Sequence, residues 1–157
     1  MRKKLEGHGT KHHAMPQKNF CFGCGKDNPK GMRLKFTLDE NRGVAVCRFR
    51  LTRQFWGPPK HAHGGIIATI LDEAMGKVIK LRHVVAVTSV MEVRYLKLVP
   101  LGKPLTVEGW EERVQGREHI NVAEIRNEAG EVLARSKGTF VAIDPLKMFE
   151  KFLRKGR

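Results

Sequence analysis

Hydrophobic residues recur as adjacent pairs, four positions apart, in the middle of the chain. The pairs are Ile66/Ile67, Ile70/Leu71, Ala74/Met75 and Val78/Ile79. This spacing is the period of an α-helix with a wide apolar stripe. The pattern therefore predicts one long helix of about 17 residues, from Gly64 to about Leu81.

Strand-like segments flank this helix, two before it and four after it. Residues 32–52 indicate a hairpin around the turn DENRG, and segments rich in alternating or β-branched residues follow at 84–99, 104–114, 119–127 and 131–143. The separators LGK, QGRE and NEAG are typical of hairpin connections, which predicts an antiparallel meander. A change of alternation between Tyr95 and Leu96 predicts a bulge or bend there.

One helix among six strands favours an α+β fold in which a curved antiparallel sheet of about six strands wraps the helix and buries its apolar stripe. We expect three regions: a flexible basic arm at 1–19, one domain at 20–144 and a basic tail at 145–157. No apolar run approaches the length of a membrane span, and the first residues lack the apolar segment of a secretory signal. We therefore expect a cytoplasmic protein with no membrane partner.

The net charge of +14 is concentrated at the two ends of the chain. Residues 1–19 and residues 145–157 each hold five Lys/Arg against one acid, which leaves +6 for the body. This surplus suits an anionic ligand such as a phosphorylated cofactor, and it suits a polynucleotide equally well.

One line along the predicted helix carries small residues and a carboxylate: Gly65, Ala68, Thr69, Asp72 and Gly76. A helix that gives up side-chain volume along a line resembles one wall of a pocket. Asp72 could instead bond a neighbouring backbone group or face solvent. The adjacent acid, Glu73, precedes Lys77 by one helical turn and is expected to form an ordinary exposed ion pair with it.

Gly64 and Gly65 at the helix start would leave unpaired N–H donors open to an incoming oxyanion. Gly65 and Asp72 lie seven residues apart, about 10.5 Å along a helix axis. One carbonyl group cannot touch both. If both act on the same bond, they come from different subunits, which predicts an active site at a dimer interface.

Cys21-x-x-Cys24 raises the question of a zinc site. A structural site needs two further ligands, and His12, His13 or Cys47 could supply them only through folding. We assign the pair to a packed loop and predict no metal and no cofactor, with zinc as the alternative. Three sparse cysteines also argue against a disulfide scaffold, so we expect reduced thiols.

The stretch HGGIIATILDEAMG resembles the helix signature of the hotdog-fold acyl-CoA thioesterases, particularly the phenylacetyl-CoA thioesterase-like branch, in which an Asp follows the His of His-Gly-Gly by nine positions. The stretches VTSVMEVRYLKLVPLGKPLTVEG and CFGCGKDNPKGMRLKF extend the resemblance over about residues 20–143. It implies hydrolysis of acyl-CoA to free acid and CoA by a homodimer or a dimer of dimers (homotetramer), with sites between subunits.

The resemblance also implies roles for particular residues. Asp72 would be the nucleophile or the base that activates water, the Gly65 N–H would polarise the thioester carbonyl, and Thr88 would orient the water. His63 and Gly64 would shape the substrate pocket. Some relatives carry an amide at the position of Gly57, and here Gln54 or His61 could take its place.

Three alternatives stay open at this point. Other hotdog branches use a Glu on this helix, so Glu73 could be the acting acid. A non-catalytic acyl-CoA-binding or nucleic-acid-binding regulatory protein on the same fold would suit the charge, although no helix-turn-helix or aromatic-rich basic surface is recognisable. A hydratase would need a paired Asp and His, and His63 lies too far from Asp72 to form that pair within one subunit.

Overall fold

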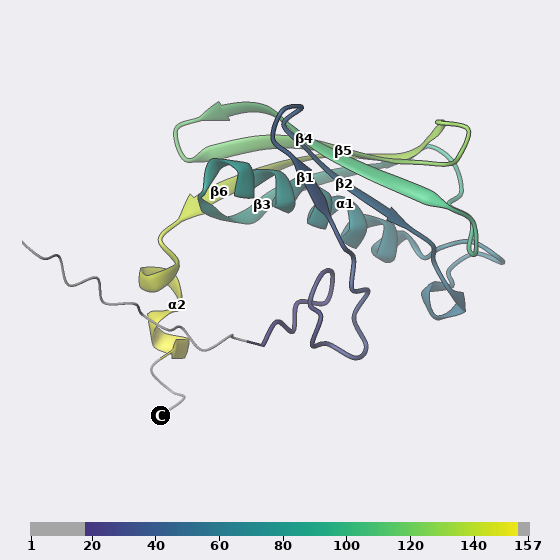
Figure 1. Ribbon diagram of the computed structural model, residues 1–157, viewed down its shortest axis with the longest axis horizontal. Helices are drawn as coiled ribbons and strands as arrows, with labels where there is room; N and C mark the ends of the chain where they lie inside the picture. The colour runs from purple at the N-terminus through teal and green to yellow at the C-terminus, as the bar shows by residue number, and fades with distance from the viewer. Residues whose placement is uncertain (1–17, 154–157) are drawn as a thin grey trace, which may run out of the picture.

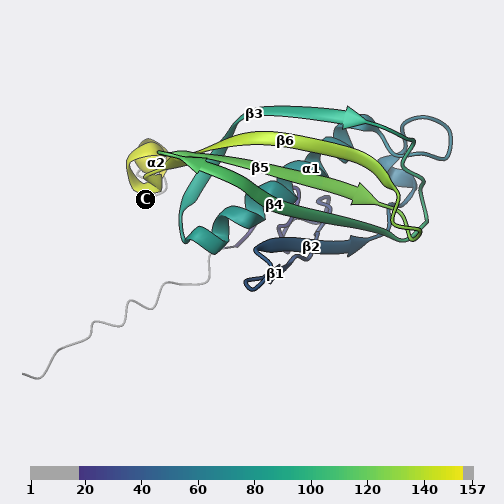
Figure 2. The same ribbon diagram turned by 90° about the horizontal axis from the view of Figure 1, so that it is seen from above.

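A six-stranded antiparallel sheet curves over one long helix in the computed structural model, which describes residues 18–153. Figure 1 shows the helix beneath the sheet, and Figure 2 shows the strands side by side in the order β1-β2-β4-β5-β6-β3. The elements are β1 (Thr37–Asp39), β2 (Val44–Phe49), the 3-10 turn η1 (Arg53–Phe55), α1 (Gly64–Ile79), the 3-10 turn η2 (Lys80–Arg82), β3 (Val85–Tyr95), β4 (Leu105–Gln115), β5 (Glu118–Arg126), β6 (Val132–Ile143) and α2 (Pro145–Leu153). The predicted fold class, helix and count of strands before and after the helix are confirmed.

The apolar stripe of α1 faces the concave side of the sheet. Its buried side chains are Ile67, Ile70, Leu71, Ala74, Met75, Val78 and Ile79, which are the predicted pairs except for the half-buried Ile66. All of these except Val78 form the main core cluster together with apolar side chains of β2, β4, β5 and β6. Burial of this stripe is the main contribution of α1 to folding.

The helix backbone approaches the sheet closely at Gly109 in β4. A Cβ added at Gly109 would lie 2.6 Å from the carbonyl oxygen of Ala74, a fixed backbone atom. At Gly138 in β6 an added Cβ would meet only side-chain ends, those of Phe140 at 3.1 Å and Met75 at 3.2 Å. Two glycines on the concave face therefore let the helix lie directly on the strands.

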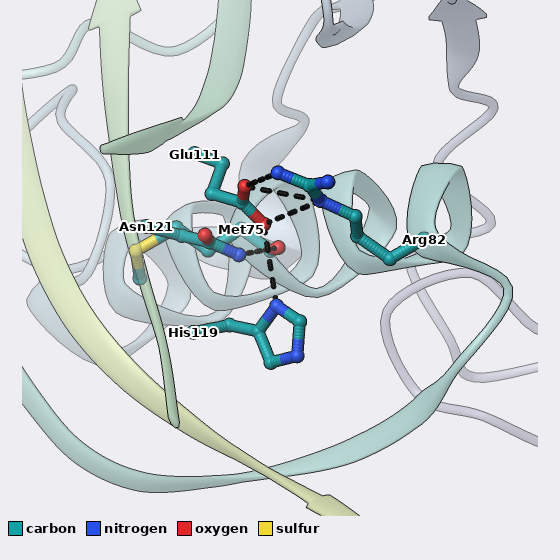
Figure 3. Close-up of polar contacts among 5 residues, drawn as sticks. All are labelled: Met75, Arg82, Glu111, His119 and Asn121. Atoms are coloured by element: carbon teal, nitrogen blue, oxygen red, sulfur yellow. Dashed lines mark hydrogen bonds and ion pairs between the residues drawn. The ribbon is translucent and has the colours of Figure 1, made fainter. Parts of the chain in front are cut away.

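Polar groups beside α1 join the helix to β4 and β5, as Figure 3 shows. The buried Asn121 donates from Nδ2 to the Met75 carbonyl at 2.9 Å. Glu111 accepts hydrogen bonds from Arg82 and lies 3.2 Å from Nδ1 of the buried His119. These contacts fix the C-terminal half of α1 against the sheet and hold the pKa of Glu111 below its ordinary value, chiefly through the Arg82 hydrogen bond.

The position of β3 corrects the predicted meander. The separators QGRE and NEAG do join paired strands, with Gly116 and Gly130 at positive φ. LGK does not, because β3 pairs with β6 and the chain then crosses to β4 in the middle of the sheet. Gly102 takes a positive φ in this connection as well. The turn residues were therefore recognised correctly, but the predicted pairing of β3 with β4 was wrong.

Two irregularities shape β3. At its end, the N–H groups of both Leu96 and Lys97 donate to the Leu133 carbonyl, at 3.0 and 2.9 Å, which confirms the bend expected after Tyr95. A second shift of register lies between Thr88 and Val90, with Ser89 as the extra residue. The sequence analysis did not predict this bulge.

Residues 145–153 form a second helix, α2, which the pattern analysis did not predict. In Figure 2 it lies beyond the end of β6. The expected arm falls mostly on residues 1–17, outside the described residues, and residues 154–157 of the expected tail are outside them too. Within residues 18–153, none of the helices has the length and apolarity needed to cross a membrane.

We predict that Gly109→Ala lowers the free energy of unfolding by about 1–3 kcal/mol, because the added methyl group must displace helix backbone. Gly138→Ala is the matched control and should cost less, since side-chain ends can move aside. Urea unfolding followed by circular dichroism measures both. Equal losses in the two variants would contradict the close approach of α1 at Gly109.

Candidate active site

The structure brings Asp72 and Thr88, two of the predicted catalytic residues, into direct contact. The Thr88 hydroxyl, Oγ1, donates to Asp72 Oδ1 at 2.8 Å. Asp72 is half-buried on α1, and Thr88 is exposed on β3 just before the bulge at Ser89. The bulge interrupts the regular alternation of side chains next to Thr88, a common device for directing a side chain beside a site.

The environment of Asp72 makes its carboxyl group harder to ionise. Burial raises the pKa of this carboxyl above its ordinary value, and the nearby charge of Glu73 adds to the rise. The hydrogen bond from Thr88 opposes both effects, because it stabilises the carboxylate. A partly desolvated carboxyl with one directed donor is a suitable general base or nucleophile.

His63 caps the start of α1 and engages the predicted oxyanion donor. The Gly65 N–H donates to the His63 ring nitrogen Nδ1 at 2.9 Å. Both residues are exposed. The Gly65 donor is therefore occupied by the His63 ring in this structure.

Tyr95 contributes a contact at the helix start that the sequence analysis missed. Its hydroxyl donates to the Gly64 carbonyl at 2.9 Å, although its side chain is 53% exposed. The end of β3 is thus joined to the His63-Gly64-Gly65 turn. The position of Tyr95 in the strand gave no signal for this role, because the contact depends on how β3 lies beside α1.

The loop before α1 leaves no room for a side chain at Gly57. A Cβ at this position would lie 2.5 Å from the Cα of His63. The loop is closed there by hydrogen bonds from the Gly57 N–H to the His61 carbonyl and from the His63 N–H to the Phe55 carbonyl, both at 2.9 Å. The ring nitrogen Nδ1 of His61 is hydrogen-bonded to the Pro59 carbonyl at 2.8 Å. Of the two residues considered as a replacement for the amide, Gln54 is therefore the one with an exposed side chain and no such contact to Pro59.

Asp72 and Glu73 contact different parts of the molecule. Glu73 contacts the segment before β1, where the Cys21 thiol donates to its Oε1 at 3.2 Å. The expected ion pair with Lys77 is present at 3.9 Å, but it is largely covered, with side chains 15% and 18% exposed, so the expectation of an exposed pair is wrong. Cys21, Cys24 and Glu73 are the one group of possible metal ligands that residues 18–153 bring together.

The helix keeps the two halves of the predicted site apart within one chain. Gly65 and Asp72 both lie in the continuous α1, and their separation remains about 10.5 Å along the axis. His63, Gly64 and Gly65 therefore gather with Tyr95 at one end of β3, whereas Asp72 meets Thr88 nearer its other end.

A cavity of about 810 Å³ lies elsewhere, at the C-terminal end of α1. Its arginines are each paired with a glutamate in the pairs Arg42–Glu108, Arg82–Glu111 and Arg126–Glu124. Because a further acid, Glu40, also lines it, the cavity offers no surplus of positive charge for phosphate groups. It does not contain the predicted site residues.

Comparison with known proteins agrees with the fold. The family model of the thioesterase superfamily matches residues 59–134, a range that includes His63, Asp72 and Thr88. The acyl-coenzyme A thioesterase THEM4 of Xenopus laevis is 28% identical over 101 residues, which cover 64% of this chain and 46% of that protein. The chain thus spans about half the length of this curated relative.

Two solved structures are similar along most of the chain. A thioesterase superfamily protein, 28% identical, superposes with a TM-score of 0.74 and covers 78% of this chain and 60% of its own. The Escherichia coli PaaI protein from the phenylacetic acid degradation operon, 22% identical, gives 0.65 with 71% and 80% covered. Residues 59–134 therefore match the thioesterase superfamily, and the chain has the hotdog fold of these similar proteins.

Proposed function

We propose that the protein hydrolyses the thioester bond of acyl-CoA to a free acid and CoA, at a site completed by a second copy of the chain. The contact between the half-buried Asp72 and Thr88 carries this proposal, because it holds a carboxylate at the border between α1 and an edge strand. The similarity to the Xenopus laevis acyl-coenzyme A thioesterase supports the choice of substrate.

The second copy is expected to join at β3. This strand pairs with β6 on one side and borders no other strand of the described chain, so the N–H and C=O groups of its outer edge are open. It also exposes large apolar side chains, including Val85 at 49%, Val90 at 64% and Tyr95 at 53%. A second β3 would cover both features and join two sheets.

Antiparallel pairing of two β3 strands would unite the separated halves of the site. The end of one strand that carries Tyr95 would lie toward the Thr88 end of the other, because antiparallel neighbours run in opposite directions. Tyr95 holds the helix start through Gly64, and Thr88 holds Asp72. The helix start of one subunit would thereby approach the carboxylate of the other.

The reaction then follows from the groups present. When the His63 ring turns away, the Gly65 N–H can donate to the thioester oxygen, on which negative charge develops during attack. Asp72 either takes a proton from water, which Thr88 helps to orient, or adds to the carbonyl itself. The C–S bond breaks, the CoA thiolate leaves and takes up a proton, and water supplies the hydroxyl of the acid.

We predict that Asp72→Asn lowers kcat for CoA release from a panel of short, long and aromatic acyl-CoA thioesters by roughly 10²–10⁴-fold. Glu73→Gln should lose far less, since Glu73 contacts the cysteine segment. Because burial raises the pKa of Asp72 in the folded state, ionisation at neutral pH opposes folding, and Asp72→Asn should unfold at an equal or higher temperature. A larger kinetic loss in Glu73→Gln would transfer the role to that acid, and acyl-CoA binding without turnover would contradict hydrolysis.

The pH dependence of kcat/KM should report the state of Asp72. Activity needs the carboxylate, so it should fall as pH drops through a pKa raised above 3.8. Thr88→Val removes the hydrogen bond that holds this pKa down, and the acidic limb should move to higher pH. Ser89→Ala is the control, because that hydroxyl donates to the Thr139 carbonyl at 3.2 Å. A limb that moves equally in both variants would argue against Asp72 as the titrating group.

Mixed dimers test whether the site is shared. Asp72→Asn and Gly65→Pro, which removes the N–H, should each be inactive alone. After unfolding and refolding together, about a quarter of the sites should work, since half of the dimers are mixed and each keeps one intact pair. Adding Val90→Lys to both chains should prevent the rescue by blocking the β3 edge. Two folded but inactive variants that never complement each other would place the site within one subunit.

A further inference from the structure

A long irregular segment, residues 18–36, precedes β1 and lies on the side of α1 away from the sheet (Figure 1). Its one buried apolar side chain is Leu34. The segment is held by hydrogen bonds, among them Asn19 N–H to Asp27 Oδ2 at 2.6 Å and Asn28 Nδ2 to the Phe20 carbonyl at 3.1 Å. Ordered segments of this length without helix or strand are uncommon and are usually functional.

Two glycines shape the segment around Cys21 and Cys24. The Gly25 N–H donates to the Cys21 carbonyl at 2.8 Å, and a Cβ at Gly25 would lie 2.5 Å from that oxygen. A Cβ at Gly23 would overlap the side chain of Glu73. The backbone thus turns tightly around the two thiols. Gly23, which has no side chain, leaves space for the Glu73 side chain to reach the thiols from α1.

The resulting cluster has the geometry of a ligand set. Ligand atoms of Cys21, Cys24 and Glu73 all lie within 4.8 Å of one another. The Cys21 thiol already donates to Glu73 Oε1 at 3.2 Å. Two sulfurs and one oxygen at these separations can converge on one tetrahedral ion with small side-chain movements.

Lys77 supplies charge next to the cluster. Its Nζ donates to Cys24 Sγ at 2.9 Å and lies 3.9 Å from Glu73 Oε2. Two thiolates and a carboxylate carry three negative charges, which a divalent ion and the Lys77 ammonium would balance. N–H donors to the sulfurs of a metal site are a usual part of the surroundings that tune it.

We propose that Cys21, Cys24 and Glu73 bind one zinc ion, with Lys77 as a hydrogen-bond donor to the Cys24 sulfur. Two soft sulfurs select zinc over magnesium or calcium. Binding replaces the two thiol protons, which leave to solvent, and the fourth position takes a water molecule. The ion would fasten residues 18–36 to α1, and this role is separate from the proposed hydrolysis.

Cobalt(II) titration of the reduced full-length chain tests the site, because a Co²⁺–thiolate bond gives a near-ultraviolet charge-transfer band. The band should saturate at one equivalent, and zinc should displace cobalt and raise the melting temperature. Cys21→Ser and Cys24→Ser should abolish the band, and Glu73→Gln should weaken binding at least about tenfold. Cys47→Ala, which changes the buried cysteine outside the cluster, should keep it.

The readout separates this site from other metal binding. His8, His12 and His13 could bind cobalt through nitrogen, but such binding gives no thiolate band. Absence of the band at saturating cobalt in fully reduced protein would overturn the proposal, as would a band that survives Cys24→Ser. The protein could be isolated with a Cys21–Cys24 disulfide. Failure to bind zinc after reduction of that disulfide would also overturn the proposal. No outcome depends on thioesterase activity.

Discussion

The direct contact between the backbone of α1 and the sheet governs the rest of this structure. Gly109 has no side chain where the Ala74 carbonyl approaches, so the strands can curve closely around the helix. This closeness buries the paired apolar residues of α1 and leaves Asp72 on the flank of the helix that meets β3. A helix held farther away would separate Asp72 from Thr88, because the hydrogen bond between them spans only 2.8 Å.

The strand that completes the candidate site also forms an open edge of the sheet. β3 brings Thr88 to Asp72 and Tyr95 to the start of α1, and its outer edge faces no other strand of the described chain. Exposed edges attract other strands, and natural proteins usually protect them. In the proposed dimer, a second copy would cover the exposed apolar side chains of β3, so assembly and chemistry would depend on this one strand.

Much of the charge in the folded domain is paired. Glu124 on β5 contacts both Arg126 and Arg135, and Lys137 on β6 contacts Glu112 of β4 at 2.6 Å. The arginines around the cavity at the C-terminal end of α1 are paired with glutamates as well. The net charge of +14 therefore says little by itself about a phosphate-binding surface, because composition does not record which charges neutralise each other.

Local patterns in the sequence were sufficient for α1 and the six strands, but not for α2. The period of the apolar pairs defined α1, the turn glycines located the connections, and the spacing from His63 to Asp72 carried the family resemblance. These features depend on residues close in the chain. The spacing of Gly65 and Asp72 along one helix also predicted that the two residues come from different subunits if both act on the same bond.

Only the tertiary structure decided the pairings between distant residues. It placed β3 beside β6, gave Asp72 its contact with Thr88, occupied the Gly65 donor with His63, and brought Glu73 to Cys21 across 52 positions. The sequence pattern of a strand is the same whichever strand it pairs with. An acidic residue likewise gives no local sign of whether its carboxylate faces solvent or a thiol. Such choices are set by the packing of the whole chain, which no local window of sequence contains.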